Sequence, residues 1–123
     1  MKFLLIDVHH NEVKVVEANG LDDYYKHIGC DCIDIVRRKI ADLKVNIICD
    51  DNGTLVDHPK VSAVNVVGKP CLYGNLLIAG GKVIDGELTE LTEKEIRHIK
   101  MFLIGATTKY HKEPYKVIYG MDY

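Results

Sequence analysis

The sequence lacks several features that would assign it to a protein class directly. It contains no apolar run near the roughly 20 residues that a membrane-spanning helix needs. Its first residues are apolar too briefly for a signal peptide, since Asp7 follows at once. Internal repeats and low-complexity segments are also absent. We therefore expect a cytoplasmic protein without a membrane partner.

The sequence also has no marked excess of positive or negative charge. The 16 basic and 18 acidic residues give a net charge of −2. A generic nucleic-acid coat needs a basic excess to displace counterions from phosphates, so nucleic acid is not an expected partner. The apolar content of 47% and charged content of 28% are typical of a globular chain. A length of 123 residues supports one domain, residues 1–123, with its four cysteines as free thiols.

Motifs that carry chemistry are scarce. The one serine, Ser62, has no glycine-flanked nucleophile pattern around it. Cys30 and Cys32 lack the second close pair that a structural zinc site requires. The acidic residues before Gly53 lack the ligand spacing of an EF-hand. These patterns predict no metal, no cofactor and no catalytic residue set.

Four segments have clear secondary-structure signals. Residues 2–8 and 12–17 read as two antiparallel strands joined by a polar turn. Residues 21–28 carry the apolar stripe of a short helix, which we expect to end at Gly29. Thr92 and Glu95 form a capping box at the start of a second helix, which we expect to continue to Gly105.

The stretch from Val45 to Gly80 predicts the centre of the sheet. Residues 45–49 are apolar, and Asn52-Gly53 suits a tight hairpin turn, so we expect residues 54–56 to return as the partner strand. Residues 72–80 form a second apolar run. Residues 61–67 fit either a helical turn or an irregular strand.

The tail, residues 106–123, repeats apolar residues at strand period from Tyr115. We expect it to be an edge strand, or an arm that exchanges with a second copy, outside a core of residues 1–105. The overall expectation is an α+β fold: a mixed, mainly antiparallel sheet covered by two helices, with a C-terminal tail strand. The arm also predicts a homo-oligomer, with a dimer as the simplest case.

The order of these segments resembles the small bacterial and phage family called domain of unknown function 3846. The likeness rests on the N-terminal hairpin, the glycine-ended helix, the run from Gly74 to Gly80 and the capped segment 88–96, and it covers roughly residues 2–103. The family usually has Asn-Arg soon after a proline; here Pro59 is followed by Val61-Ser62 at that place. The resemblance implies a phage or mobile-element setting, where short accessory proteins often neutralise a host factor. It carries over no catalytic residue.

Cations near aromatic rings are the candidate binding residues. Arg37 and Arg38 end a predicted strand, and Lys82 follows two glycines whose backbone N–H groups can cradle an anion. Arginine side chains bind phosphate oxygens bidentately, and tyrosine rings stack on nucleic-acid bases. The tail also places cations beside tyrosines, so it contributes candidates as well. The full set of candidates is Arg37, Arg38, Asn75, Lys82, Lys109, Tyr110 and Tyr115.

These residues favour a non-enzymatic binding protein that sequesters either a host protein or a small phosphate-bearing molecule such as a signalling nucleotide. One alternative is a small nucleotide-processing enzyme with His98 or His111 as the general base. The other is a structural partner protein, in which the basic residues only keep the surface solvated.

Overall fold

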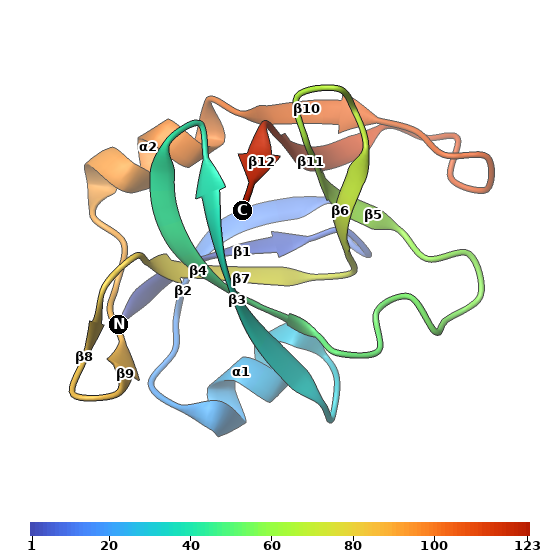
Figure 1. The fold of residues 1–123 in the computed structure, drawn as a ribbon. Coiled ribbons are helices and arrows are strands. Elements are labelled where there is room, and N and C mark those ends of the chain that lie inside the picture. Colours follow the sequence, from blue (N-terminus) through green and yellow to red (C-terminus); the bar gives the residue numbers. More distant parts are fainter.

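The computed structural model describes all residues, 1–123, as two short helices and three sheets (Figure 1). The helices are α1 (Leu21–Ile28) and α2 (Glu93–Lys100). The strands are β1 (Lys2–Asp7), β2 (Glu12–Glu17), β3 (Ile33–Ile40), β4 (Leu43–Asp50), β5 (Val61–Val64), β6 (Pro70–Tyr73), β7 (Leu76–Gly80), β8 (Val83–Ile84), β9 (Glu87–Leu88), β10 (Leu103–Ala106), β11 (Tyr115–Tyr119) and β12 (Met121–Asp122).

The six-stranded sheet has the order β12-β3-β4-β7-β1-β2, and every neighbouring pair in it is antiparallel. A four-stranded sheet has the order β10-β11-β5-β6 and contains one parallel pair, β11 with β5. Strands β8 and β9 form a small separate hairpin. The expected α+β class with mainly antiparallel sheets is therefore confirmed.

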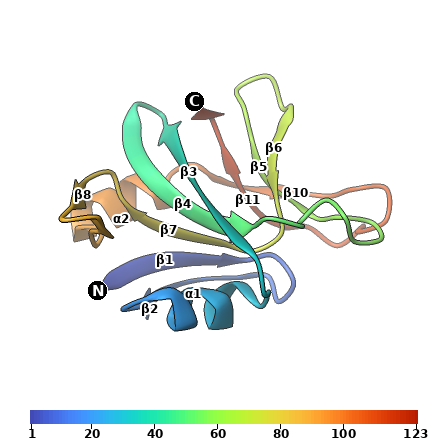
Figure 2. The ribbon, with the colours of Figure 1, turned by 60° about the horizontal axis from the view of Figure 1, so that its bottom comes forward.

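The central strands β1, β4 and β7 of the large sheet are buried on both faces because helix α1 covers one face and the four-stranded sheet with α2 covers the other (Figure 2). Side chains alternate between the faces along a strand. Phe3 and Leu5 accordingly pack with Tyr24 of α1, while Leu4 and Ile6 join the core between the sheets. That second core is the larger, with 17 buried residues against nine.

The N-terminal third agrees with its sequence signals. Strands β1 and β2 pair in register from Lys2 opposite Glu17 to Asp7 opposite Glu12. Helix α1 ends at Gly29, whose φ of 81° is left-handed and whose N–H donates to the carbonyl of Tyr25. Both predictions are confirmed.

The predicted central hairpin is wrong. Strand β4 pairs with β3 and β7, and residues 54–56 form no strand. The chain turns instead at Ala41 and Asp42, whose φ angles of 45° and 70° have the signs that a type I′ turn requires at both central positions.

The Asn52-Gly53 pair has a different role, in a loop that leads from β4 to β5. A Cβ atom at Gly53 would lie 2.9 Å from the carbonyl oxygen of Tyr73, so the glycine permits two backbones to approach closely. Leu55 and Val56 are 77% and 54% exposed, which shows why their apolar character does not make a core strand.

Helix α2 starts as expected and ends early. Thr92 Oγ1 accepts a hydrogen bond from the N–H of Glu95, and the Glu95 carboxylate accepts one from the N–H of Thr92, so the capping box is confirmed. The helix ends at Lys100 rather than at Gly105. Residues 103–106 leave the helix because they pair with β11 as strand β10.

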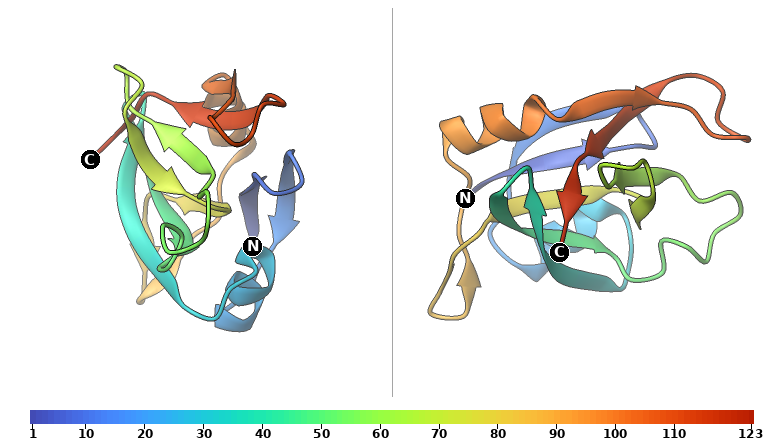
Figure 3. Two further views of the ribbon diagram at one scale, coloured as in Figure 1. Left: turned by 90° about the vertical axis from the view of Figure 1, so that its right-hand side faces the viewer. Right: turned by 45° about the horizontal axis from the view of Figure 1, so that its top comes forward.

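The tail is part of the core, so the prediction of an edge strand at Tyr115–Tyr119 is wrong, while exchange of the tail with a second copy stays a prediction. Strand β11 lies between β10 and β5 (Figure 3). Its residues Val117 and Ile118 are fully buried. After β11, the two-residue strand β12 lies at an edge of the six-stranded sheet, where it pairs with β3 of the same chain. The undecided segment 61–67 contributes β5, an irregular strand with register shifts against β6.

Candidate functional site

Four cations gather at the turn end of the β3–β4 hairpin. A hollow of about 220 Å³ is lined by Arg37, Arg38, Lys39, Lys44, Val45 and Tyr123. We call its four cations, Arg37, Arg38, Lys39 and Lys44, the hairpin cluster.

Strand register explains how these side chains meet. Lys39 lies opposite Lys44, and Arg38 lies opposite Val45. Because consecutive residues point to opposite faces, Arg38 projects from the face opposite that of its neighbours Arg37 and Lys39. Strand β12 pairs with β3 at Lys39, which brings Tyr123 beside Arg38. The hairpin cluster therefore surrounds the sheet edge at the point where β12 ends.

No ion pair joins the hairpin cluster to a carboxylate, although Asp122 lies opposite Lys39 in the sheet. The ion pairs in the structure join Met1 to Glu17, His10 to Asp7 and Lys14 to Glu12, all in the N-terminal hairpin. Arg38 Nη1 donates to the backbone carbonyl of Arg37 over 2.8 Å. Since a guanidinium carries five N–H donors, Arg38 retains donors for a bound anion.

The glycine pair before Lys82 packs directly against this cluster. Arg37 Nη2 lies 3.5 Å from the carbonyl oxygen of Gly81, to which it donates. A Cβ atom at Gly81 would clash with the backbone carbonyl of Lys44, so only glycine fits here. Lys82 follows next in the chain and is exposed, but it does not line the hollow.

The tail candidates lie elsewhere. Lys109 and Tyr110 belong to the loop between β10 and β11, which extends from the opposite end of the molecule in Figure 1. The Lys109 ammonium is 5.5 Å from the centre of the Tyr110 ring. Tyr115 is buried, and its hydroxyl donates to the carbonyl of Val61 over 2.8 Å. The structure thus separates the predicted residues into two groups.

Asn75 is unavailable to a ligand. Its side chain is 7% exposed, and its Oδ1 accepts a hydrogen bond from the N–H of Val8 over 2.9 Å. Its Nδ2 donates to the carbonyl of Ile28 over 3.5 Å. The amide therefore joins β1 and α1 to the start of β7, and we correct its assignment from ligand-binding to structural.

The two histidines considered as general bases are both engaged. His98 Nε2 is 2.9 Å from the backbone carbonyl of Ile40, to which it donates, and its ring packs against Phe102. His111 Nδ1 is 2.9 Å from the Thr108 hydroxyl. Neither histidine lines the hollow of the hairpin cluster.

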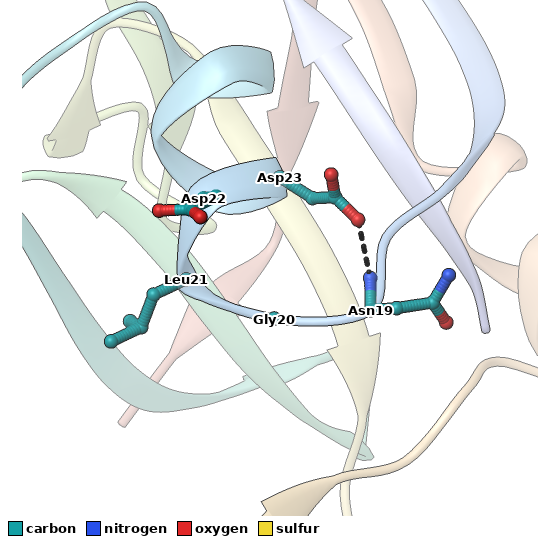
Figure 4. Close-up of a pocket in the computed structure, with 5 residues that line it drawn as sticks. All are labelled: Asn19, Gly20, Leu21, Asp22 and Asp23. Carbon is teal, nitrogen blue, oxygen red and sulfur yellow. Dashed lines mark hydrogen bonds between the residues drawn. The ribbon is translucent and has the colours of Figure 1, made fainter.

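Another hollow, of about 340 Å³, lies at the start of α1 and is acidic (Figure 4). The Asp23 carboxylate accepts a hydrogen bond from the N–H of Asn19 over 2.8 Å, so this side chain has a structural function. Asp22 adds a second negative charge that would repel phosphate. No group of three or more His, Cys, Asp or Glu side chains is placed to hold a metal ion, and neither helix has the length and apolar character to cross a membrane.

Comparison with known families gives one match. The profile described as Domain of unknown function (DUF3846) matches residues 1–103. The chain belongs to this family. The region that matches DUF3846 contains all four cations of the hairpin cluster and ends at the first residue of β10. Tyr123 lies beyond it. No curated protein and no solved structure matches the chain.

Sequence reasoning identified Arg37 and Arg38 but missed Lys44 and Tyr123. The signal for Lys44 is the strand register: a turn at Ala41-Asp42 places Lys39 opposite Lys44. Tyr123 carried no such signal, because its position depends on β12 pairing with a strand some 80 residues earlier.

Proposed function

We propose that this DUF3846 protein binds a small phosphate-bearing ligand non-covalently at the hairpin cluster and holds it intact. The observation that carries the proposal is the set of four cations on two paired strands with no carboxylate partner. Arg37, Lys39 and Lys44 lie on one face of the hairpin and Arg38 lies on the other, yet all four line the hollow, so a multiply charged anion there is attracted by each of them.

The residue types suit phosphate recognition. Arginine presents a planar fork that grips two phosphate oxygens, and lysine adds point charges around it. The hollow of about 220 Å³ is smaller than the pockets of roughly 300 Å³ or more that enclose drug-sized ligands, so it fits a phosphate or pyrophosphate group. The Tyr123 side chain is 80% exposed, which leaves room for a base to stack outside the hollow.

The lining of the hollow favours binding over turnover. It contains no histidine, carboxylate, thiol or aliphatic hydroxyl that could act as a nucleophile or move a proton near neutral pH. A ligand is therefore expected to leave unchanged, which suits sequestration of a signalling nucleotide.

The proposal is tested by isothermal titration calorimetry with pyrophosphate. We expect Arg38→Gln to weaken the affinity about tenfold or more, since it removes a charge-assisted contact. The matched control is Lys26→Gln, which removes an exposed positive charge from α1 and leaves the affinity unchanged. Equal affinities for the native protein and Arg38→Gln would refute the hairpin cluster as the site. Chromatography of the recovered ligand checks that it remains intact.

Native mass spectrometry of protein purified from its host identifies the natural ligand. Extra mass equal to an intact nucleotide or other phosphate compound supports sequestration of a small molecule. Polypeptide mass alone shifts the choice to a protein partner. The same spectrum gives the mass of the assembly and tests the proposed homo-oligomer.

A further inference from the structure

The second group of cations lies where two loops meet beside β11. The His58 ring stacks on the Tyr110 ring with their centres 3.6 Å apart and an angle of 27° between their planes. This contact joins the loop between β4 and β5 to the loop between β10 and β11. Side chains from distant parts of the sequence are thereby held together.

The buried Tyr115 ring lies at the centre of this region and contacts two of its basic side chains. The Lys60 ammonium lies 4.8 Å from the ring centre and donates to the carbonyl of Val8 over 3.0 Å. The His111 ring meets Tyr115 edge-on, with centres 6.5 Å apart. His111 is held in place by Thr108, whose hydroxyl accepts from the His111 N–H over 3.0 Å and also contacts Nδ1. Lys60 and His111 therefore lie around one buried ring.

The side chains in this region are basic, and no ion pair neutralises them. Burial, followed by the positive charges of Lys60, His58 and His9, lowers the pKa of His111. Acidic side chains occur in the same segments, but Asp57 and Glu113 form no ion pair, and Asp7 is already paired with His10. We call His58, Lys60 and His111 the loop cluster.

We propose that the loop cluster is a second anion-binding site, specific for a dianionic oxyanion such as a sulfate or a phosphate ester, and that its histidines take up protons as the anion binds. The fixed charge of Lys60 provides the initial attraction. The imidazole N–H groups that form on protonation provide charge-assisted hydrogen bonds. The site is separate from the hairpin cluster, and its histidines are absent from that hollow.

The pH dependence follows from linkage. A bound anion stabilises the protonated imidazole, so it raises the histidine pKa in the complex above that of the free protein. Affinity is therefore lowest above the pKa of the complex and rises as the pH falls through it. Arginine and lysine side chains keep their charge from about pH 5.5 to about pH 8, so binding at the hairpin cluster is flat over this range.

Sulfate is the probe, because it remains a dianion throughout this range. We expect its affinity to be about tenfold higher near pH 5.5 than near pH 8. Calorimetry in two buffers of different ionisation heat is expected to show net proton uptake. NMR spectra of the imidazole C–H protons are expected to show His111 titrating at higher pH when sulfate is present.

Two variants test whether the histidines take up the protons. His58→Phe retains an aromatic ring on Tyr110 without a titrating group, and His111→Gln retains a hydrogen-bonding partner for Thr108. Together they are expected to abolish proton uptake, while Arg38→Gln leaves it unchanged. Backbone amide spectra check that both variants fold.

Three outcomes would each refute the loop cluster as an anion site: sulfate binding without proton uptake, proton uptake that survives the double variant, or no sulfate binding near pH 5.5. Pyrophosphate binding near pH 8 tests the hairpin cluster separately.

Discussion

The guanidinium carbon of Arg38 lies 4.3 Å from the centre of the Tyr123 ring. The contact joins one cation of the hairpin cluster, on strand β3, to the residue that follows the short strand β12. A cation over an aromatic face is favourable by about 0.5–1 kcal/mol at an exposed position. The ring also limits the orientations of the guanidinium, which prepares it for an anion.

Removal of this ring is therefore expected to weaken pyrophosphate binding. Tyr123→Ala frees the Arg38 side chain and is predicted to lower the affinity about threefold, as measured by calorimetry. Tyr123→Phe keeps the aromatic face and is the matched control, with an affinity within error of the native protein. An equal loss in both variants would mean that the hydroxyl, and not the ring, matters.

The β3–β4 turn is a place where the sequence can be improved. Ala41 and Asp42 both have positive φ, which costs an ordinary L-residue roughly 1 kcal/mol. We expect the double change Ala41→Asn with Asp42→Gly to raise the free energy of unfolding by about 1 kcal/mol in urea titrations. Asn52→Ala, in the exposed loop after β4, is expected to change it by less than about 0.5 kcal/mol. The reverse order of effects would favour a turn at Asn52-Gly53.

Ser62 is a buried hydroxyl without a hydrogen-bond partner. Ser62 is 0% exposed in β5, and its Oγ atom has no hydrogen-bond partner. Since an unpaired buried hydroxyl costs free energy, Ser62→Ala is predicted to stabilise the protein by about 1 kcal/mol in thermal or urea unfolding. Ala63→Ser adds a hydroxyl at the adjacent buried position and is predicted to destabilise it. Destabilisation by Ser62→Ala would instead reveal a hydrogen bond to this hydroxyl.

Cys49 is predicted to resist alkylation. Burial, together with the negative charge of Asp34, raises the pKa of the Cys49 thiol to about 11. Near pH 8 only about one thiol in a thousand is then the reactive thiolate, and the side chain is 6% exposed. Peptide mass spectrometry after brief iodoacetamide treatment is expected to show label on the exposed Cys32 and none on Cys49.

Denaturant provides the control for this prediction. In concentrated urea Cys49 loses its burial, so its pKa returns toward the ordinary thiol value and labelling becomes comparable with that of Cys32. Rapid labelling of Cys49 in the native protein would show that β4 opens locally.

The sequence predicted those parts of the fold whose signals are local. The capping box at Thr92 and the left-handed glycine at position 29 each involve residues within one or two helical turns. The hairpin was misplaced because Asn52-Gly53 is a stronger local turn signal than Ala41-Asp42. The pairing energy of the eight-residue strands β3 and β4 outweighs that preference. The register of β4 is set by its pairing with both β3 and β7, which a local turn signal does not reveal.

The same distinction holds for the two clusters. Arg37 and Arg38 are adjacent in sequence and were predicted together, whereas Lys44 requires the register of β4. The loop cluster combines His58, Lys60 and His111 from segments some 50 residues apart, which no local pattern indicates. Asn75 was mistaken for a ligand because sequence does not distinguish an exposed amide from one that is buried and fully bonded.

The central position of β11 in its sheet also constrains the order of folding during synthesis. Strands β5 and β10 flank β11, but both leave the ribosome before it does. Until residues 115–121 emerge, the apolar faces that pack against Val117, Ile118 and Met121 remain without their partners. The nascent chain therefore completes its core after translation of this segment rather than progressively, and until then these apolar faces stay exposed to solvent.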